Sequence, residues 1–168
     1  WLGTQEGLNR FDGKNFKIYK NNPTDSLSIS GNFINRLLED SEGNIWVATA
    51  GEGLCYFDPN TDTFKRTPIT KGNYKTLAMD KSGNVYAADD QKGLVVFKKD
   101  VNFEPVVYQN LPFIITAMTI EKNQLMVGTR AGGLYKTALD NLKDDWTKVA
   151  NQVPGSIEEI SKYQNEWL

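Results

Sequence analysis

Short apolar runs separated by turn-forming residues predict β-strands along most of this chain. Between residues 33 and 66 the runs are rich in β-branched and aromatic residues, which favour strands. The segments between them carry Gly, Asn, Asp and Pro, the residues that tight turns use. Four short strands joined by such turns form an antiparallel meander. The predicted strands are 33–39, 45–49, 54–57 and 63–66.

The same order of strands and turns recurs in two later segments. One predicts strands at 74–79, 85–88 and 94–98, and the other at 115–120, 125–129, 133–137 and 146–149. Residues 1–32 fit the same pattern without its first strand. Residues 156–161 have the pattern of one more first strand. The chain is therefore best described in repeats.

Two landmarks recur in one phase at intervals of about forty residues, the length of one propeller blade. The first landmark is a large residue in the second strand, followed two positions later by a small one. The second landmark is the Gly-Leu pair at the start of the third strand. Large next to small along one face lets neighbouring blades interdigitate. We predict an all-β fold, a β-propeller of four-stranded antiparallel blades. The large residues are Trp1, Trp46, Tyr86, Met126 and Trp167, the small ones are Gly3, Ala48, Ala88 and Gly128, and the Gly-Leu pairs begin at Gly7, Gly53, Gly93 and Gly133.

The repeat boundaries divide the chain, 1–168, as a single propeller segment of about four blades. A closed four-bladed ring would form if a strand near Ile157 completed the first blade. The alternative is an arc of a larger propeller. Because the repeat resumes at Trp167, we expect the arc, within a longer protein. The blade repeats are 1–32, 33–72, 73–113 and 114–155, with the first strand of a next blade in 156–168.

Composition narrows the chemistry of the segment. The net charge is −2, so no overall basic field attracts nucleic acid or an anionic membrane. The chain has no histidine, which removes the commonest general base and most zinc sites. Its one cysteine, Cys55, lies in a strand-like run and is predicted to be a small buried hydrophobe. The acidic turns 40–44 and 80–84 lack the ligand spacing of a calcium loop and are predicted to be structural. We expect no enzyme activity, cofactor or metal site in this segment.

Residues 34–53 resemble the consensus of the two-component regulator propeller repeat. That consensus has Glu-Asp and Gly-Asn before an aliphatic-Trp pair, then Gly-Thr and a Gly-rich turn before Leu. Residues 38–54 follow it closely, with Ala48 at the Gly position. The loop 22–28 is similar to the usual link between blades, and residues 7–12 match the third strand and its turn. The third and fourth copies diverge, with Tyr86 and Met126 in place of Trp.

The resemblance implies the periplasmic sensor of a hybrid two-component regulator of Bacteroidetes. Such sensors place large propellers before a membrane helix and a histidine kinase. Many of these sensors bind oligosaccharides, and such sensors are typically dimeric. The resemblance therefore implies a ligand-sensing module that binds an oligosaccharide or another small ligand, acts in signal transduction, and reaches the membrane only through segments outside this chain.

Candidate ligand-binding residues follow from the geometry of a propeller. Loops between second and third strands, and links between blades, rise to one rim that commonly builds the ligand site. Amides, acids, an arginine and an aromatic ring suit sugar hydroxyls. The longest link, 21–32, is the expected functional insertion, or it spans a wider gap between blades. The candidates are Glu6, Asn32, Glu52, Tyr74, Asp89 and Arg130.

Two other classes of function remain open at this point. The rim or the outer strands could bind another protein or a second copy, which would make the segment an interaction scaffold. A propeller lyase or hydrolase acting through carboxylates is the third reading, and the missing histidine argues against it.

Overall fold

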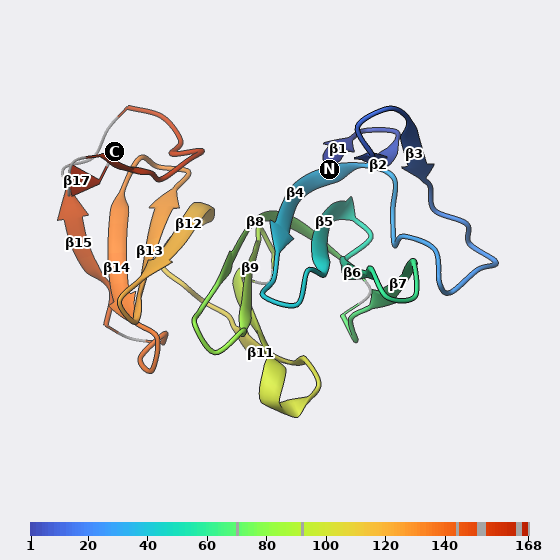
Figure 1. Ribbon diagram of the computed structural model, residues 1–168. Coiled ribbons are helices and arrows are strands. Elements are labelled where there is room, and N and C mark those ends of the chain that lie inside the picture. The colour runs from blue at the N-terminus through green and yellow to red at the C-terminus, as the bar shows by residue number, and fades with distance from the viewer. Residues whose placement is uncertain (70, 92, 144, 151–153, 164–165, 168) are drawn as a thin grey trace.

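Antiparallel strands make up almost all the regular structure of the chain (Figure 1). The computed structural model describes residues 1–69, 71–91, 93–143, 145–150, 154–163 and 166–167. In this part the strands form successive meanders that lie in chain order along an arc, from β1 on the right of Figure 1 to β15 on the left. The predicted all-β propeller fold is confirmed.

The first two meanders cover the N-terminal part of the chain. The first has three strands, β1 (Leu2–Thr4), β2 (Gly7–Phe11) and β3 (Phe16–Tyr19). The second has four, β4 (Ile34–Glu39), β5 (Ile45–Gly51), β6 (Leu54–Asp58) and β7 (Thr63–Arg66). The bounds of the second meander agree with the predicted strands to within about two residues.

The next two meanders each have four strands as well. The third blade contains β8 (Gly72–Met79), β9 (Val85–Asp89), β10 (Gly93–Lys98), the short 3-10 helix η1 (Lys99–Val101) and β11 (Glu104–Tyr108). The fourth contains β12 (Ile115–Glu121), β13 (Gln124–Thr129), β14 (Leu134–Ala138) and β15 (Thr147–Ala150). A two-stranded hairpin, β16 (Lys162–Tyr163) and β17 (Glu166–Trp167), follows.

The first strand of the next blade, predicted at 156–161, is not formed. These residues have no strand pairing, although the Ile157 N–H donates to the Thr129 carbonyl at 3.1 Å. An inner strand needs the second strand of its own blade as partner, and the strands that follow, β16 and β17, pair with each other. In the first blade β1 pairs with β2 alone, so the segment near Ile157 does not complete it. The described chain is an open arc.

Small residues on the second strands receive large residues from the next blade, as the sequence predicts. A Cβ at Gly3 would lie 2.6 Å from the Ile34 Cγ2, and one at Gly128 would overlap the Ile157 side chain. Tyr74 lies in the same buried cluster as Ala48, which occupies the equivalent position in the second blade. Each small residue therefore makes room for one apolar side chain of the following blade.

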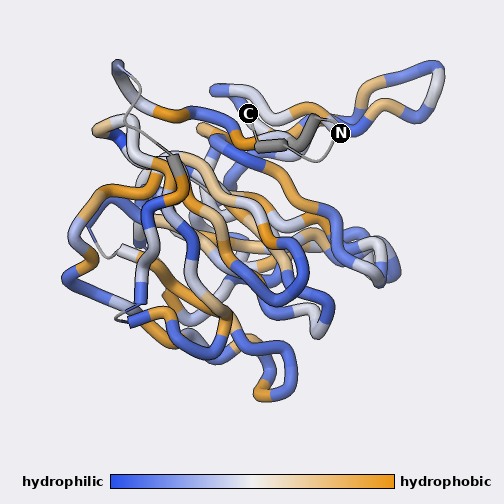
Figure 2. Tube along the Cα trace, turned by 90° about the vertical axis from the view of Figure 1, so that its left-hand side faces the viewer, coloured by the Kyte–Doolittle hydropathy of each residue, from blue (hydrophilic) through white to orange (hydrophobic). Residues whose placement is uncertain are grey.

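The hydrophobic core is divided into clusters between neighbouring blades. Figure 2 shows hydrophobic residues along the strands and hydrophilic residues at the turns. Trp46 is completely buried in the cluster between the second and third blades. Cys55 is also fully buried, and burial raises the pKa of its thiol, as expected of a structural cysteine. Packing between neighbouring blades therefore helps to hold the arc together.

The acidic turn of the repeat is a hydrogen-bonded cap on the second strand. One oxygen of Asp40 accepts from the backbone N–H groups of Glu42 and Asn44, both at 2.9 Å. Its other oxygen accepts from the Asn44 amide at 2.9 Å and from the Trp46 indole N–H at 3.1 Å. These turns are structural, as the sequence predicts.

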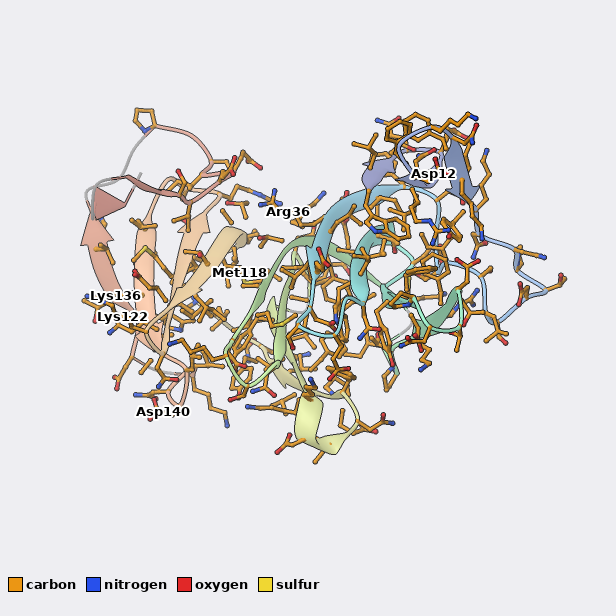
Figure 3. The ribbon with its side chains drawn as sticks, in the orientation of Figure 1. Asp12, Arg36, Met118, Lys122, Lys136 and Asp140 are labelled. Atoms are coloured by element: carbon orange, nitrogen blue, oxygen red, sulfur yellow. The ribbon has the colours of Figure 1, made fainter. Side chains whose placement is uncertain are left out.

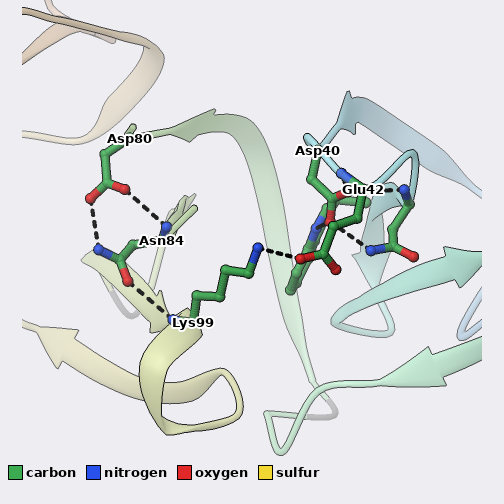
Figure 4. Close-up of polar contacts among 7 residues, drawn as sticks. Asp40, Glu42, Asp80, Asn84 and Lys99 are labelled. Atoms are coloured by element: carbon green, nitrogen blue, oxygen red, sulfur yellow. Dashed lines mark hydrogen bonds and ion pairs between the residues drawn. The ribbon is translucent and has the colours of Figure 1, made fainter. Parts of the chain in front are cut away.

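The turn of the third blade repeats this arrangement around Asp80, where the Tyr86 hydroxyl replaces the indole at 3.1 Å. Figure 4 shows the two turns side by side, joined by Lys99. The Lys99 backbone N–H donates to Asn84 at 3.0 Å, and its ammonium pairs with Glu42 at 2.5 Å. One lysine therefore connects the turns of two blades.

The substitution Asp40→Asn is expected to lower the free energy of unfolding and to make that free energy less dependent on pH in acid. Partial burial raises the pKa of the Asp40 carboxyl, but hydrogen bonds from Asn44 and Trp46 outweigh burial and leave the pKa below its ordinary value. The carboxylate therefore contributes stability above its unfolded-state pKa, and this is lost as the pH falls through the folded pKa, below about pH 4.

Denaturant unfolding at pH 7 should show a loss of about 1–2 kcal/mol for Asp40→Asn. Its stability should also fall less steeply than that of the wild type from pH 5 to pH 2. Ser41→Ala, in the same exposed turn, is the control. A slope in Asp40→Asn equal to that of the control would contradict the assignment.

Candidate functional site

A β-bulge occurs at the same position in three inner strands. The register shifts between Ile34 and Arg36 in β4, between Tyr74 and Thr76 in β8, and between Ile115 and Ala117 in β12. A bulge adds one unpaired residue and re-aims its side chain. The added residues are Asn35, Lys75 and Thr116.

The three bulged residues line one cavity of about 460 Å³. The segment after the fourth blade contributes Ser156 and Glu158 to the same wall. Glu158 follows Ile157 as Asn35 follows Ile34, and both isoleucines pack on the small residue of the preceding blade. One residue from each of four consecutive repeats therefore faces the axis of the arc. We call this space the axial cavity. Its full lining is Asn35, Arg36, Lys75, Thr116, Arg130, Ser156 and Glu158.

Two of the bulged residues connect adjacent blades by hydrogen bonds. The Asn35 amide donates to the Tyr74 carbonyl at 2.8 Å, and the Thr116 hydroxyl donates to the Ile157 carbonyl at 2.5 Å. Lys75, at the equivalent position of the third blade, makes no hydrogen bond or ion pair in the part of the chain that the structure describes. Its exposed side chain is therefore not used to hold the blades together.

The cavity wall carries three cations, all of them exposed. Arg36 projects from β4 toward the space between β4 and β12 (Figure 3), and Arg130 follows the last residue of β13. Lys75 comes from β8 between them. Glu158 is the one carboxylate among the described lining residues. Such a wall offers donors to the hydroxyls or charged groups of a ligand.

Arg130 is the predicted site residue that lies in this cavity. The remaining five lie elsewhere. Glu6 is exposed in the first blade and pairs with Lys20 at 3.6 Å. The Asn32 side chain accepts from the Asn21 backbone N–H at 2.7 Å, and Glu52 packs beside Gly31. The structure therefore does not gather Glu6, Asn32 and Glu52 around Arg130.

Tyr74 and Asp89 have positions different from the predicted rim. Tyr74 is fully buried, so its ring packs in the protein and offers no face to a ligand. Burial also raises the pKa of its hydroxyl, with the nearby Asp89 carboxylate adding to the effect. Asp89 is 5% exposed and accepts from the backbone N–H groups of Asn73 and Gln91, at 2.5 and 2.9 Å. Both residues organise the link between blades.

A second, smaller cavity of about 200 Å³ adjoins Asp89 at the link between the second and third blades. Two of its lining residues are glycines, and the side chains of Asp89 and Lys71 already interact within the protein. The cavity therefore ranks behind the axial one as a ligand site. Its lining is Gly51, Lys71, Gly72, Asn73, Asp89 and Gln91.

The link 21–32, expected to be a functional insertion or a spacer, folds back on its own blade and its neighbour. The Asn21 amide donates to the Ile29 carbonyl at 2.7 Å, and Ile29 is completely buried. The Phe64 N–H donates to the Leu27 carbonyl at 2.9 Å, which fixes the loop to β7. The contacts of this link are thus structural.

Asn35, Arg36, Lys75 and Thr116 are functional candidates that the sequence reasoning missed. The signal available for the three bulged residues is positional, because each follows the first large apolar residue of an inner strand. A strict alternation of strand faces hides this signal, since the bulge shifts the phase.

Neither a metal centre nor a membrane span emerges from the described residues. Within them, no group of three or more His, Cys, Asp or Glu side chains is placed to hold a metal ion. In the same part of the chain, no helix has the length and apolar character needed to cross a membrane.

Comparison with known proteins supports the repeat type and the fold. The family described as two component regulator propeller matches residues 28–51. The histidine kinase P4 of Formosa agariphila is 70% identical over 30 residues, which cover 18% of this chain and 2% of that protein. The chain is therefore a β-propeller segment. The match at 28–51 overlaps the resemblance to this repeat predicted at 34–53.

Solved structures show the same fold over most of the chain. The extracellular domain of a one component system from B. thetaiotaomicron superimposes with a TM-score of 0.78 at 19% identity, covering 98% of this chain and 23% of that one. The extracellular domain of a hybrid two component system from the same organism gives a TM-score of 0.66 at 21% identity, covering 86% and 19%. The chain thus spans less than a quarter of either structure.

Proposed function

We propose that this chain is part of the extracytoplasmic sensor of a bacterial two-component signalling protein and that it binds an oligosaccharide without chemical turnover. The observation that carries the proposal is the axial cavity, to which four consecutive repeats contribute side chains. The guanidinium groups of Arg36 and Arg130, the Lys75 ammonium and the Glu158 carboxylate on this wall are donors and acceptors that suit sugar hydroxyls. The repeat of the second blade and the extracellular neighbours support the setting.

Binding to the axial cavity is tested by titration calorimetry of the protein with a panel of purified oligosaccharides. We expect heat from at least one panel member and its loss in Ser156→Trp, because an indole on the exposed cavity wall fills the space. Ser41→Trp places the same bulk on an exposed turn outside the cavity and should bind normally.

The outcomes of this titration separate the parts of the proposal. Heat that persists in Ser156→Trp would move the ligand to another site, such as the cavity beside Asp89. The absence of heat from every panel member would remove the oligosaccharide from the proposal. A concentration-dependent mass without any small-ligand response would instead favour an interaction scaffold.

A further inference from the structure

The charge of the axial cavity is opposite to that of the chain. The chain as a whole has a net charge of −2. The cavity wall brings together Arg36, Lys75 and Arg130 against the single carboxylate of Glu158. All four side chains are exposed, and three formal positive charges face one negative charge, so the wall is locally cationic. A local field of this kind attracts anions even to an acidic protein.

The three cations of the cavity are left without internal partners. No ion pair or hydrogen bond of their side chains is found in the described part of the chain. Some cations elsewhere are paired, as in Lys65 with Asp58 at 2.9 Å and Arg10 with Asp62 at 3.3 Å, whereas these three are not. What distinguishes the cavity is that three such cations, from three successive blades, lie on one wall.

Structural needs of the fold do not account for the cation at position 75. The equivalent residues Asn35 and Thr116 connect their blade to the next one through hydrogen bonds. Lys75 makes no such bond, and its long side chain remains exposed beside the cavity. Because the Lys75 ammonium makes no hydrogen bond between blades, it is available to bind a ligand from solution.

We infer that the axial cavity binds an anionic group of a saccharide, either the carboxylate of a uronic acid or a sulfate ester. The inference rests on the proposed function, since it specifies the ligand of that sensor. Two guanidinium groups present planar donor pairs that match the oxygens of carboxylate and sulfate, and the Lys75 ammonium adds a point charge. Asn35 and Thr116 remain committed to the blades and shape the wall.

The experiment is a titration series with saccharides matched for everything except charge. The probes are oligogalacturonates and their methyl esters, xylo-oligosaccharides with and without a glucuronic acid branch, and galactan oligosaccharides with and without sulfate. The anionic members should bind at least about tenfold more tightly than their neutral partners, and raising the salt concentration should weaken them. The uronate and sulfate arms identify which anion the cavity takes.

Charge variants locate the binding in this cavity. Lys75→Gln and Arg130→Gln should each weaken binding of the anionic probe about tenfold, whereas Glu158→Gln should strengthen it by removing a repulsive charge. Lys14→Gln, an exposed lysine on the first blade, is the matched control and should bind normally. Equal thermal unfolding of all four variants shows that the fold is intact.

The results distinguish failure of this inference from failure of the proposed function. Equal binding of neutral and anionic partners, or unchanged binding in Lys75→Gln and Arg130→Gln, would overturn the anion site and leave an oligosaccharide sensor. Binding by no member of the series would overturn both.

Discussion

Trp46→Ala is expected to destabilise the protein by about 3–5 kcal/mol. The indole is completely buried between the second and third blades. Its ring centroid lies 4.8 Å from that of Tyr56 and 4.7 Å from that of Phe103, so truncation removes aromatic contacts in both blades. It also leaves the Asp40 oxygen without its indole donor. Equilibrium unfolding in denaturant measures the loss.

Trp46→Phe is the matched control for this truncation. Phenylalanine retains an aromatic ring in the cluster but has no N–H for Asp40, so the expected loss is smaller, about 1–2 kcal/mol. A cost below about 1 kcal/mol for Trp46→Ala would contradict the assignment of this ring to the packing between blades.

The second large effect is expected from Gly93→Ala, at about 2–4 kcal/mol. Gly93 has φ +82°, where an L-residue is strained, and its added Cβ would lie 2.5 Å from the Tyr108 carbonyl oxygen. Because that oxygen belongs to the backbone of β11, the outer strand itself must shift. The midpoint of denaturant unfolding again provides the measurement.

Gly43→Ala separates the two causes of this strain. Gly43 has almost the same φ, +80°, but a Cβ there would meet nothing within 4 Å. Its expected cost is therefore that of the left-handed backbone alone, about 1–2 kcal/mol. Equal losses in the two variants would show that the close approach of β11 does not restrict position 93.

Most strands could be predicted from the sequence because their turns and buried residues follow one repeat. The outer strand of the third blade could not. There the chain passes through η1, and Asn102 and Phe103 have φ values of 55° and 59°. Such values usually occur at glycine, and this segment has none, so the sequence gives no signal for the turn. Pro105 lies within β11, which it can do because β11 is an edge strand that pairs only with β10.

The lining of the axial cavity was predicted only in part, because side-chain direction depends on the bulges. The turn after β13 placed Arg130 among the predicted rim residues, and its side chain lies in the cavity wall. Tyr74 was predicted to offer an exposed ring to a ligand. Its burial could not be foreseen, because it depends on packing with Ala48 of the preceding blade. Alternation of strand faces also gives no sign that Lys75 turns toward the axis, since the phase changes at that residue.

The recurrent bulge separates the residues that define the cavity from those that stabilise the fold. Lys75 can be exchanged without disturbing Tyr74 or Thr76, the buried residues on either side of it. Asn35 and Thr116 are held by hydrogen bonds to the next segment, so position 75 is the bulged position that can vary while the core is retained. The charge of the cavity wall can therefore change by a single substitution there, without any change to the packing of the blade.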